Sequence, residues 1–139
     1  MKQSIFIDTN FLCALYNEKD ALHEKARGIW PTLDEFYYTV SNFILLEAYT
    51  ILSQRVSKTQ AIFFGNYVRK ENPYTIFWID RNLENDIWEI FKLIKDKDFS
   101  YVDASILAVM KKEKIKHLLS FDAGFKNLQE QFKFNLHGA

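Results

Sequence analysis

The chain has 139 residues, of which 48% are hydrophobic and 26% are charged, enough for a sizeable core, so we expect a single domain over residues 1–139. Its 18 basic and 18 acidic residues give a formal net charge of zero, which excludes a protein that attracts nucleic acid or anionic membranes through its overall field. Cys13 is the only cysteine and no apolar stretch resembles a signal peptide or a membrane span, so we expect no internal disulfide, no membrane association and a cytoplasmic location.

Short β-rich segments alternate with helical patterns along the chain. From the N-terminus, the sequence predicts a strand at Ser4–Asp8, a helix at Ala21–Trp30, a strand at Tyr37–Val40, helices at Asn42–Arg55 and Thr59–Glu71, a strand at Thr75–Ile79, helices at Asn82–Lys95 and Tyr101–Lys114, a strand at His117–Phe121, a short helix at Ala123–Glu130 and a strand at Phe132–Leu136,. We expect the first three strands to be buried and the last to close an edge. The alternation is typical of βαβ crossovers, which predict an α/β fold with a mostly parallel sheet and helices on both faces.

Several acidic residues follow the predicted strands or lie early in the predicted helices. Asp8 ends the first strand, Asp122 follows the fourth, and Asp103 lies in the first turn of the helix that begins at Tyr101. In an open parallel sheet, ligands bind outside the carboxyl ends of the strands, where the chain turns into the next helix. We therefore expect these carboxylates to lie together at one edge of the sheet.

Glu47 lies in the middle of the predicted helix over residues 42–55. Its i−4 and i+4 neighbours, Phe43 and Ile51, are both apolar, so we expect its carboxylate on or beside the buried face of that helix. A carboxylate in this position needs a partner, because burying an unpaired charge is costly. Glu47 is therefore the acid that a purely structural role explains least well.

The other three acids also have a structural explanation. Asp8 and Asp122 could cap the helices that follow them, and the helix dipole favours Asp103 in a first helical turn. These explanations are independent of one another, whereas one cation site accounts for Asp8, Glu47, Asp103 and Asp122 together. The four acids taken as a group therefore favour a metal site.

The segments that carry these acids are "FIDTN", "SNFILLE", "FSYVDASILAVM" and "LLSFDAGF". In this order they resemble the motif series of PIN-domain ribonucleases, the family that includes the toxins of VapBC-type toxin–antitoxin pairs, and the resemblance runs from Ile5 to about Phe125. It implies a PIN-like three-layer α/β/α sandwich and a metal-dependent endoribonuclease. It also makes four residues the catalytic and metal-binding set: Asp8, Glu47, Asp103 and Asp122.

The resemblance assigns supporting roles to three further residues. Asn10 resembles the polar residue that the family places beside its first acid. Ser120 stands where the family more often has threonine, and because the hydroxyl is kept, we expect its hydrogen bond to be kept as well. Asp98 resembles an acid that often precedes the third motif, and we expect it to cap a helix or to lie outside the direct ligands of the metal.

Phosphodiester hydrolysis explains why such a site needs carboxylates. The reaction requires an activated water and stabilisation of the charge that develops on the phosphate, and hard divalent ions held by carboxylate oxygens supply both. We therefore expect Mg²⁺ or Mn²⁺, with Asp8, Asp103 and Asp122 as direct ligands and Glu47 as a ligand or as the holder of a metal-bound water. Candidates for holding the RNA substrate are Arg55 with Lys58, Arg69 with Lys70, and the basic stretch over residues 111–116, although the last is better explained as a solvated helix end.

Partners and alternatives follow from the same resemblance. A toxin is expected to bind a cognate antitoxin and to form a homodimer, and the apolar helical segment Ala61–Val68 could supply part of either interface. Two alternatives stay open within the fold, namely a catalytically silent PIN-like interaction module and a housekeeping RNA-processing nuclease. A phosphatase of the haloacid dehalogenase type is disfavoured, because Asn10 stands where that family has a second aspartate.

Overall fold

A computed structural model describes residues 1–139. Its strands are β1 (Gln3–Ile7), β2 (Phe36–Ser41), β3 (Thr75–Phe77), β4 (His117–Leu119) and β5 (Asn135–His137). Its α-helices are α1 (Thr9–Tyr16), α2 (His23–Ile29), α3 (Asn42–Arg55), α4 (Lys58–Glu71), α5 (Arg81–Leu93), α6 (Tyr101–Glu113) and α7 (Gln129–Phe132). Two 3₁₀ segments complete the chain, η1 (Trp30–Leu33) and η2 (Ala123–Leu128).

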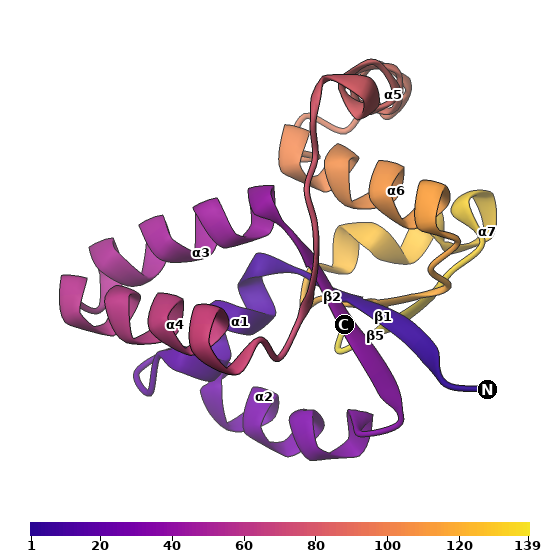
Figure 1. Ribbon diagram of the computed structural model, residues 1–139. Helices are drawn as coiled ribbons and strands as arrows, with labels where there is room; N and C mark the ends of the chain where they lie inside the picture. Colours follow the sequence, from indigo (N-terminus) through magenta and orange to yellow (C-terminus); the bar gives the residue numbers. More distant parts are fainter.

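The five strands form one sheet in the order β3-β2-β1-β4-β5, and every neighbouring pair is parallel. Figure 1 shows α1 to α4 gathered on one side of the sheet and α5 to α7 on the other. This arrangement follows from right-handed crossovers, because the chain first adds β2 and β3 on one side of β1 and then returns to add β4 and β5 on the other side. The predicted α/β/α sandwich with a parallel central sheet is confirmed.

The core lies on both faces of the sheet and is centred on β1. Ile5, Phe6 and Ile7 have no exposed surface, as expected for a strand that is covered by helices on both faces. They belong to a single cluster of 33 buried hydrophobic residues. None of the helices combines the length and the apolar content that crossing a lipid bilayer requires.

Strand β3 differs from its prediction. The segment over residues 75–79 was expected to be a buried strand, but β3 ends at Phe77 and Trp78 is 68% exposed. The strand is an edge strand that pairs only with β2. Beyond it, the Asn42 side chain accepts a hydrogen bond from Ile79 N (2.7 Å) and donates one to Ile79 O (3.2 Å). Beyond Phe77, the Asn42 side chain therefore takes the hydrogen-bonding role of a neighbouring strand. The alternation of strands and helices in the sequence does not encode such a contact.

The C-terminal elements are also shifted from their predicted positions. The segment over residues 123–130 is not one helix, because η2 is followed by the separate helix α7. Lys133 adopts a left-handed conformation (φ 56°) that ends α7. The last strand therefore begins only at Asn135, although it forms the edge of the sheet as predicted.

Candidate active site

All four predicted acids line one cavity of about 380 Å³ at the carboxyl edge of the sheet. Asp8 follows β1 and Asp122 follows β4, the neighbouring strand. The order of the strands reverses between β1 and β4, which is where ligands bind in open parallel sheets. Glu47 reaches the cavity from α3 and Asp103 reaches it from the first turn of α6.

Asp8 is the most deeply buried of the acids, with 5% of its surface exposed. One carboxylate oxygen, Oδ1, accepts a hydrogen bond from Thr9 N (2.7 Å), so Asp8 caps α1. The other, Oδ2, accepts hydrogen bonds from Ser120 Oγ (2.7 Å) and Asn10 Nδ2 (3.3 Å). The capping role and the placement in an acidic cavity therefore hold together at this residue.

The protonation of Asp8 is shifted strongly by this position. Burial raises the pKa of its carboxyl from 3.8 to about 7, and the negative charges of Asp103 and Glu47 add to the rise, whereas the hydrogen bond from Ser120 opposes it. Burial raises the pKa because a carboxylate loses its hydration in a poorly polar environment. Near neutral pH, Asp8 therefore exchanges a proton readily.

Asn10 and Ser120 tie the ends of β1 and β4 together. Asn10 Nδ2 donates to Ser120 Oγ (3.2 Å), and Phe121 N donates to Asn10 Oδ1 (3.1 Å). Ser120 Oγ also accepts from Asp122 N (3.0 Å). Ser120 is fully buried, so this network fixes the positions of the chain segments that carry the carboxylates of Asp8 and Asp122. The hydrogen bond expected of the Ser120 hydroxyl is present.

Asp103 and Asp122 each use one carboxylate oxygen to cap a helical segment. Asp103 Oδ2 accepts from Ser100 N (2.9 Å) while Ser100 Oγ accepts from Asp103 N (3.0 Å), which is a capping box,. Asp122 Oδ1 accepts from Gly124 N (2.8 Å). Burial raises the pKa of Asp103, as do the charges of Asp122 and Glu47. The second oxygen of each carboxylate takes no part in these caps.

Asp98 lies away from the cavity. It is exposed in the loop before α6, and its backbone N donates to the side chain of Asp96. Ser100, and not Asp98, caps α6. The alternative expectation, that Asp98 lies outside the direct ligands of the metal, stays a prediction. Ser100 itself lines the cavity. The spacing of Ser100 and Asp103 in the sequence is that of a capping box, and it would have indicated Ser100 as the cap of α6.

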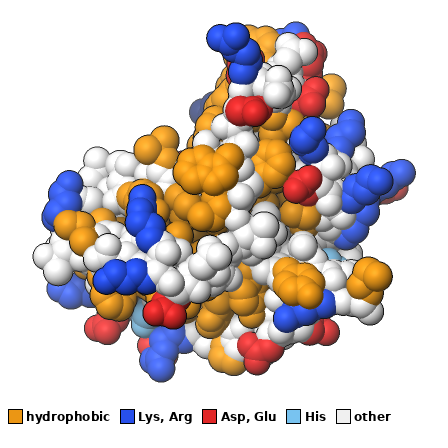
Figure 2. Space-filling model, viewed as in Figure 1, with side chains coloured by type: hydrophobic (Ala, Val, Ile, Leu, Met, Phe, Trp, Pro, Cys, Tyr) orange, Lys and Arg blue, Asp and Glu red, His pale blue; other side chains and the backbone are white.

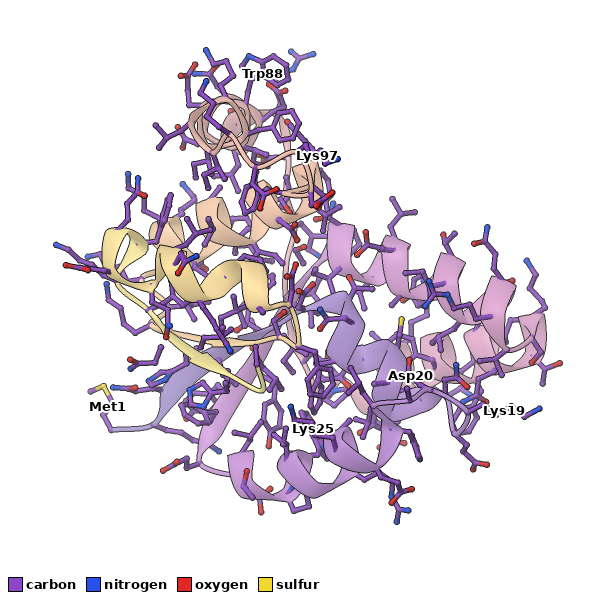
Figure 3. The ribbon with its side chains drawn as sticks, turned by 180° about the vertical axis from the view of Figure 1, so that it is seen from behind. Met1, Lys19, Asp20, Lys25, Trp88 and Lys97 are labelled. Carbon is purple, nitrogen blue, oxygen red and sulfur yellow. The ribbon has the colours of Figure 1, made fainter.

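Four further residues that line the cavity carry polar or ionisable groups, namely Thr9, Cys13, Asp20 and Arg55. Burial raises the pKa of the Cys13 thiol to about 12, with a further contribution from the charge of Glu47, so this group is not a nucleophile,. Asp20 lies in the turn before α2, next to α1 in Figure 3, and accepts a hydrogen bond from Leu22 N. No local pattern in the sequence distinguishes it from an ordinary turn residue.

The hydroxyl of Thr9 is a buried polar group without a hydrogen-bond partner. No group of three His, Cys, Asp or Glu side chains is already arranged as the ligands of one metal ion. The oxygen donors of the cavity nevertheless fit a hard divalent cation. One carboxylate oxygen of Asp103 and one of Asp122 are not used by the caps. Glu47 takes part in neither of the two ion pairs of the protein. An oxygen-lined cavity with an unpartnered hydroxyl suits Mg²⁺ or Mn²⁺ with its bound waters.

The fold and this cavity define the class of protein. Residues 5–131 match the model of the PIN domain, so the chain belongs to the PIN-domain family, as predicted. The 23S rRNA-specific endonuclease VapC20 of Mycobacterium tuberculosis is 32% identical over 121 residues, which cover 87% of this chain and 91% of that protein.

Solved structures agree with this assignment. The crystal structure of Mycobacterium tuberculosis VapC20, described as a Sarcin-Ricin loop cleaving toxin, matches with a TM-score of 0.81 and 31% identity, over 89% of this chain and 94% of that chain. FitAcB from Neisseria gonorrhoeae has the same fold, with a TM-score of 0.66, 14% identity and 95% of each chain covered. The chain is therefore a homologue of VapC20 with a PIN-domain fold.

Proposed function

We propose that this chain is a VapC-type endoribonuclease that hydrolyses RNA phosphodiester bonds with the help of Mg²⁺ or Mn²⁺ and is the toxin of a toxin–antitoxin pair. One observation carries the proposal: Asp8, Glu47, Asp103 and Asp122 line the same cavity in a homologue of an rRNA endonuclease. A catalytically silent interaction module would have no need to keep four acids together, because each of them adds repulsion to the others.

The acids divide the work of the reaction. Asp8, Asp103 and Asp122 would hold the metal ion directly, and Glu47 would be a further ligand or would orient a water beside it. When bound, the divalent ion supplies an activated water and stabilises the negative charge on the phosphate. Ser120 and Asn10 hold the Asp8 carboxylate in one orientation through their hydrogen bonds to Oδ2. Because burial raises the pKa of Asp8 to about 7, its carboxyl would have to lose a proton before it could hold a cation, and we expect cleavage to increase with pH through neutrality.

A cleavage assay on total RNA tests the proposal. The wild-type protein should cleave RNA in Mg²⁺ or Mn²⁺ and not in EDTA, and Glu47→Gln should abolish cleavage while leaving the fold intact. Glu89→Gln is the matched control, because Glu89 lies on the surface of α5 in an ion pair with Lys92 (3.0 Å). A folded wild-type protein without metal-dependent cleavage, or a fully active Glu47→Gln variant, would contradict the proposal.

An antitoxin partner is supported by an apolar groove on α3. The groove has a volume of about 690 Å³ and is lined by side chains of α3, α4 and the β3 region. Leu46 and Trp78, which line it, are 67% and 68% exposed, and Figure 2 shows hydrophobic side chains exposed across the middle of this face. Leu46 precedes Glu47, so the groove and the acidic cavity border the same turn of α3. An antitoxin segment with apolar residues in the groove can therefore direct a basic side chain towards Glu47. This side chain would take the place of the metal in the acidic cavity.

The apolar segment over residues 61–68, a predicted interface, is partly buried in the core and partly exposed. Ala61, Phe64 and Val68 are buried, whereas Ile62 and Phe63 are 53% and 59% exposed. The exposed pair suits a homodimer face, and light scattering of the wild-type protein and of a Phe63→Ser variant measures whether it forms one. Growth arrest on expression, relieved by the neighbouring gene, supports the toxin role, whereas normal growth with a folded, active product supports RNA processing.

A further inference from the structure

One basic side chain lines the acidic cavity. Arg55 comes from the last turn of α3, the same helix that carries Glu47, and its side chain is exposed to solvent. Ile51, which lies between these two residues in the sequence, lines the cavity as well. One face of α3 therefore presents a carboxylate, an apolar side chain and a guanidinium to the same space.

Arg55 has no structural role that accounts for this position. It is in neither of the two ion pairs of the protein, which join Arg27 to Glu24 and Lys92 to Glu89. The end of α3 does not need it as a cap, because the carbonyl of Leu52 accepts hydrogen bonds from Val56 N (3.0 Å) and Ser57 N (3.1 Å). The guanidinium is thus a free cation beside four acids, and it does not neutralise any of them through an ion pair.

A second basic side chain, from α2, lies over the segment that follows β4. The ammonium of Lys25, on α2, is 5.3 Å from the centre of the Phe121 ring, a cation–π contact. Phe121 is the residue between Ser120 and Asp122, and its backbone N bonds to Asn10. Figure 3 shows Lys25 between α2 and the C-terminal segment. The contact holds this lysine close to the loop that carries the fourth acid.

We propose that Arg55 and Lys25 bind RNA backbone phosphates that flank the scissile phosphate, and that they provide the electrostatic attraction that the chain lacks as a whole. The inference rests on the proposed ribonuclease function. With a formal net charge of zero, no general field attracts RNA, and four carboxylates repel it locally. Basic side chains near the acids reduce this repulsion when a polyanion approaches the cavity.

The geometry of α3 places Arg55 away from the scissile phosphate itself. Arg55 is eight residues beyond Glu47 on the same helix, which corresponds to about 12 Å along the helix axis at a rise of about 1.5 Å per residue. A phosphate held at Arg55 therefore belongs to a nucleotide further along the strand. The planar guanidinium suits this role, because it donates two parallel hydrogen bonds to phosphate oxygens.

RNA cleavage and RNA binding, measured separately, test the inference. In cleavage assays, Arg55→Gln and Lys25→Gln should each raise KM, by about tenfold for Arg55, with kcat nearly unchanged. In binding assays with a labelled single-stranded RNA, on the Glu47→Gln background, each substitution should reduce the slope of log K against log salt by about one. Arg55→Lys should keep the salt slope but recover only part of the affinity.

Controls separate charge at this site from charge in general. Arg27→Gln removes a basic residue from the same helix as Lys25, and Arg81→Gln removes an exposed one at the start of α5; both should leave KM unchanged. All variants should keep the melting temperature of the wild-type protein. Unchanged KM and salt slope in Arg55→Gln would overturn the inference while leaving the nuclease proposal standing. Absence of cleavage by the wild-type protein would instead overturn the nuclease proposal.

Discussion

Replacing Asp8 by asparagine should stabilise the metal-free protein and abolish cleavage. The native pKa of Asp8 is about 7 and its ordinary value is 3.8, so the native state binds a proton more tightly than the unfolded chain does. Stability then falls as pH rises from about 4 to about 7 and stays level above that. The resulting cost to the native state is about 4 kcal/mol above pH 7 and about 2 kcal/mol at pH 5.

Asparagine removes this cost but also loses hydrogen bonds. Its side-chain oxygen can still accept from Thr9 N, whereas its amide nitrogen would face the donors Ser120 Oγ and Asn10 Nδ2, which now bond to Asp8 Oδ2. That loss amounts to about 1 to 3 kcal/mol. The net gain from Asp8→Asn should therefore be about 1 to 3 kcal/mol at pH 8 and close to zero at pH 5.

Urea unfolding of both proteins in EDTA at pH 5 and pH 8 measures this difference. In a parallel series, Mn²⁺ should stabilise the wild-type protein and leave the stability of Asp8→Asn unchanged. A helix cap alone behaves differently, because asparagine caps a helix about as well as aspartate. Equal stability of the two proteins at both pH values, together with retained cleavage by Asp8→Asn, would refute the reasoning.

Three further substitutions test the surroundings of the cavity. Thr9→Val removes a buried hydroxyl without a partner and should raise stability in EDTA by about 1 kcal/mol, which a melt measures; a loss would indicate that the hydroxyl has a partner. Ser120→Ala should lower stability by about 1 to 3 kcal/mol and reduce cleavage, because the buried Asp8 carboxylate loses a hydrogen-bond donor,. Ser120→Thr keeps the hydroxyl and should keep both stability and cleavage. Equal effects of these two substitutions would contradict the role of the hydroxyl. Burial lowers the pKa of His137 below 6.5, and His117, its hydrogen-bond partner, lowers it further, so His137 contributes a loss of stability as pH drops below 6.5, opposite in sign to the gain from Asp8. His137→Gln should therefore gain more stability than the wild-type protein as pH drops from 6.5 to 5, which unfolding of both proteins at these pH values measures; equal gains would contradict this.

Much of the fold could be predicted because its signals are local. A strand that is covered on both faces must be apolar along its length, as Ile5 to Ile7 are, and the alternation of such strands with helices leaves a parallel sheet as the simplest arrangement. Asp8 and Asp122 could be placed at one edge because the carboxyl ends of parallel strands meet there. Glu47 stood out because its neighbours are apolar.

The parts that could not be predicted depend on distant contacts. The end of β3 is set by Asn42, which lies 37 residues from Ile79. Arg55 was one of several basic candidates for holding RNA, and only the cavity, which brings it beside the acids, distinguishes it from the others. Asp98 was assigned from its place before a motif, whereas the cap was set by the spacing of Ser100 and Asp103. Sequence patterns therefore located the four acids of the cavity better than they located the other residues around it.

The hydrogen bond between Ser120 and Asp8 joins residues that are 112 positions apart, and this separation has a consequence for synthesis. A ribosome makes the chain from the N-terminus, so β1, β2 and the helices α1 to α4 are made before β4 and β5. The central strand β1 acquires its second neighbour, and Asp8 its hydroxyl donor, only after the chain has been made as far as Ser120. A nascent chain that ends before β4 therefore lacks both the second neighbour of β1 and the full set of acids in the cavity.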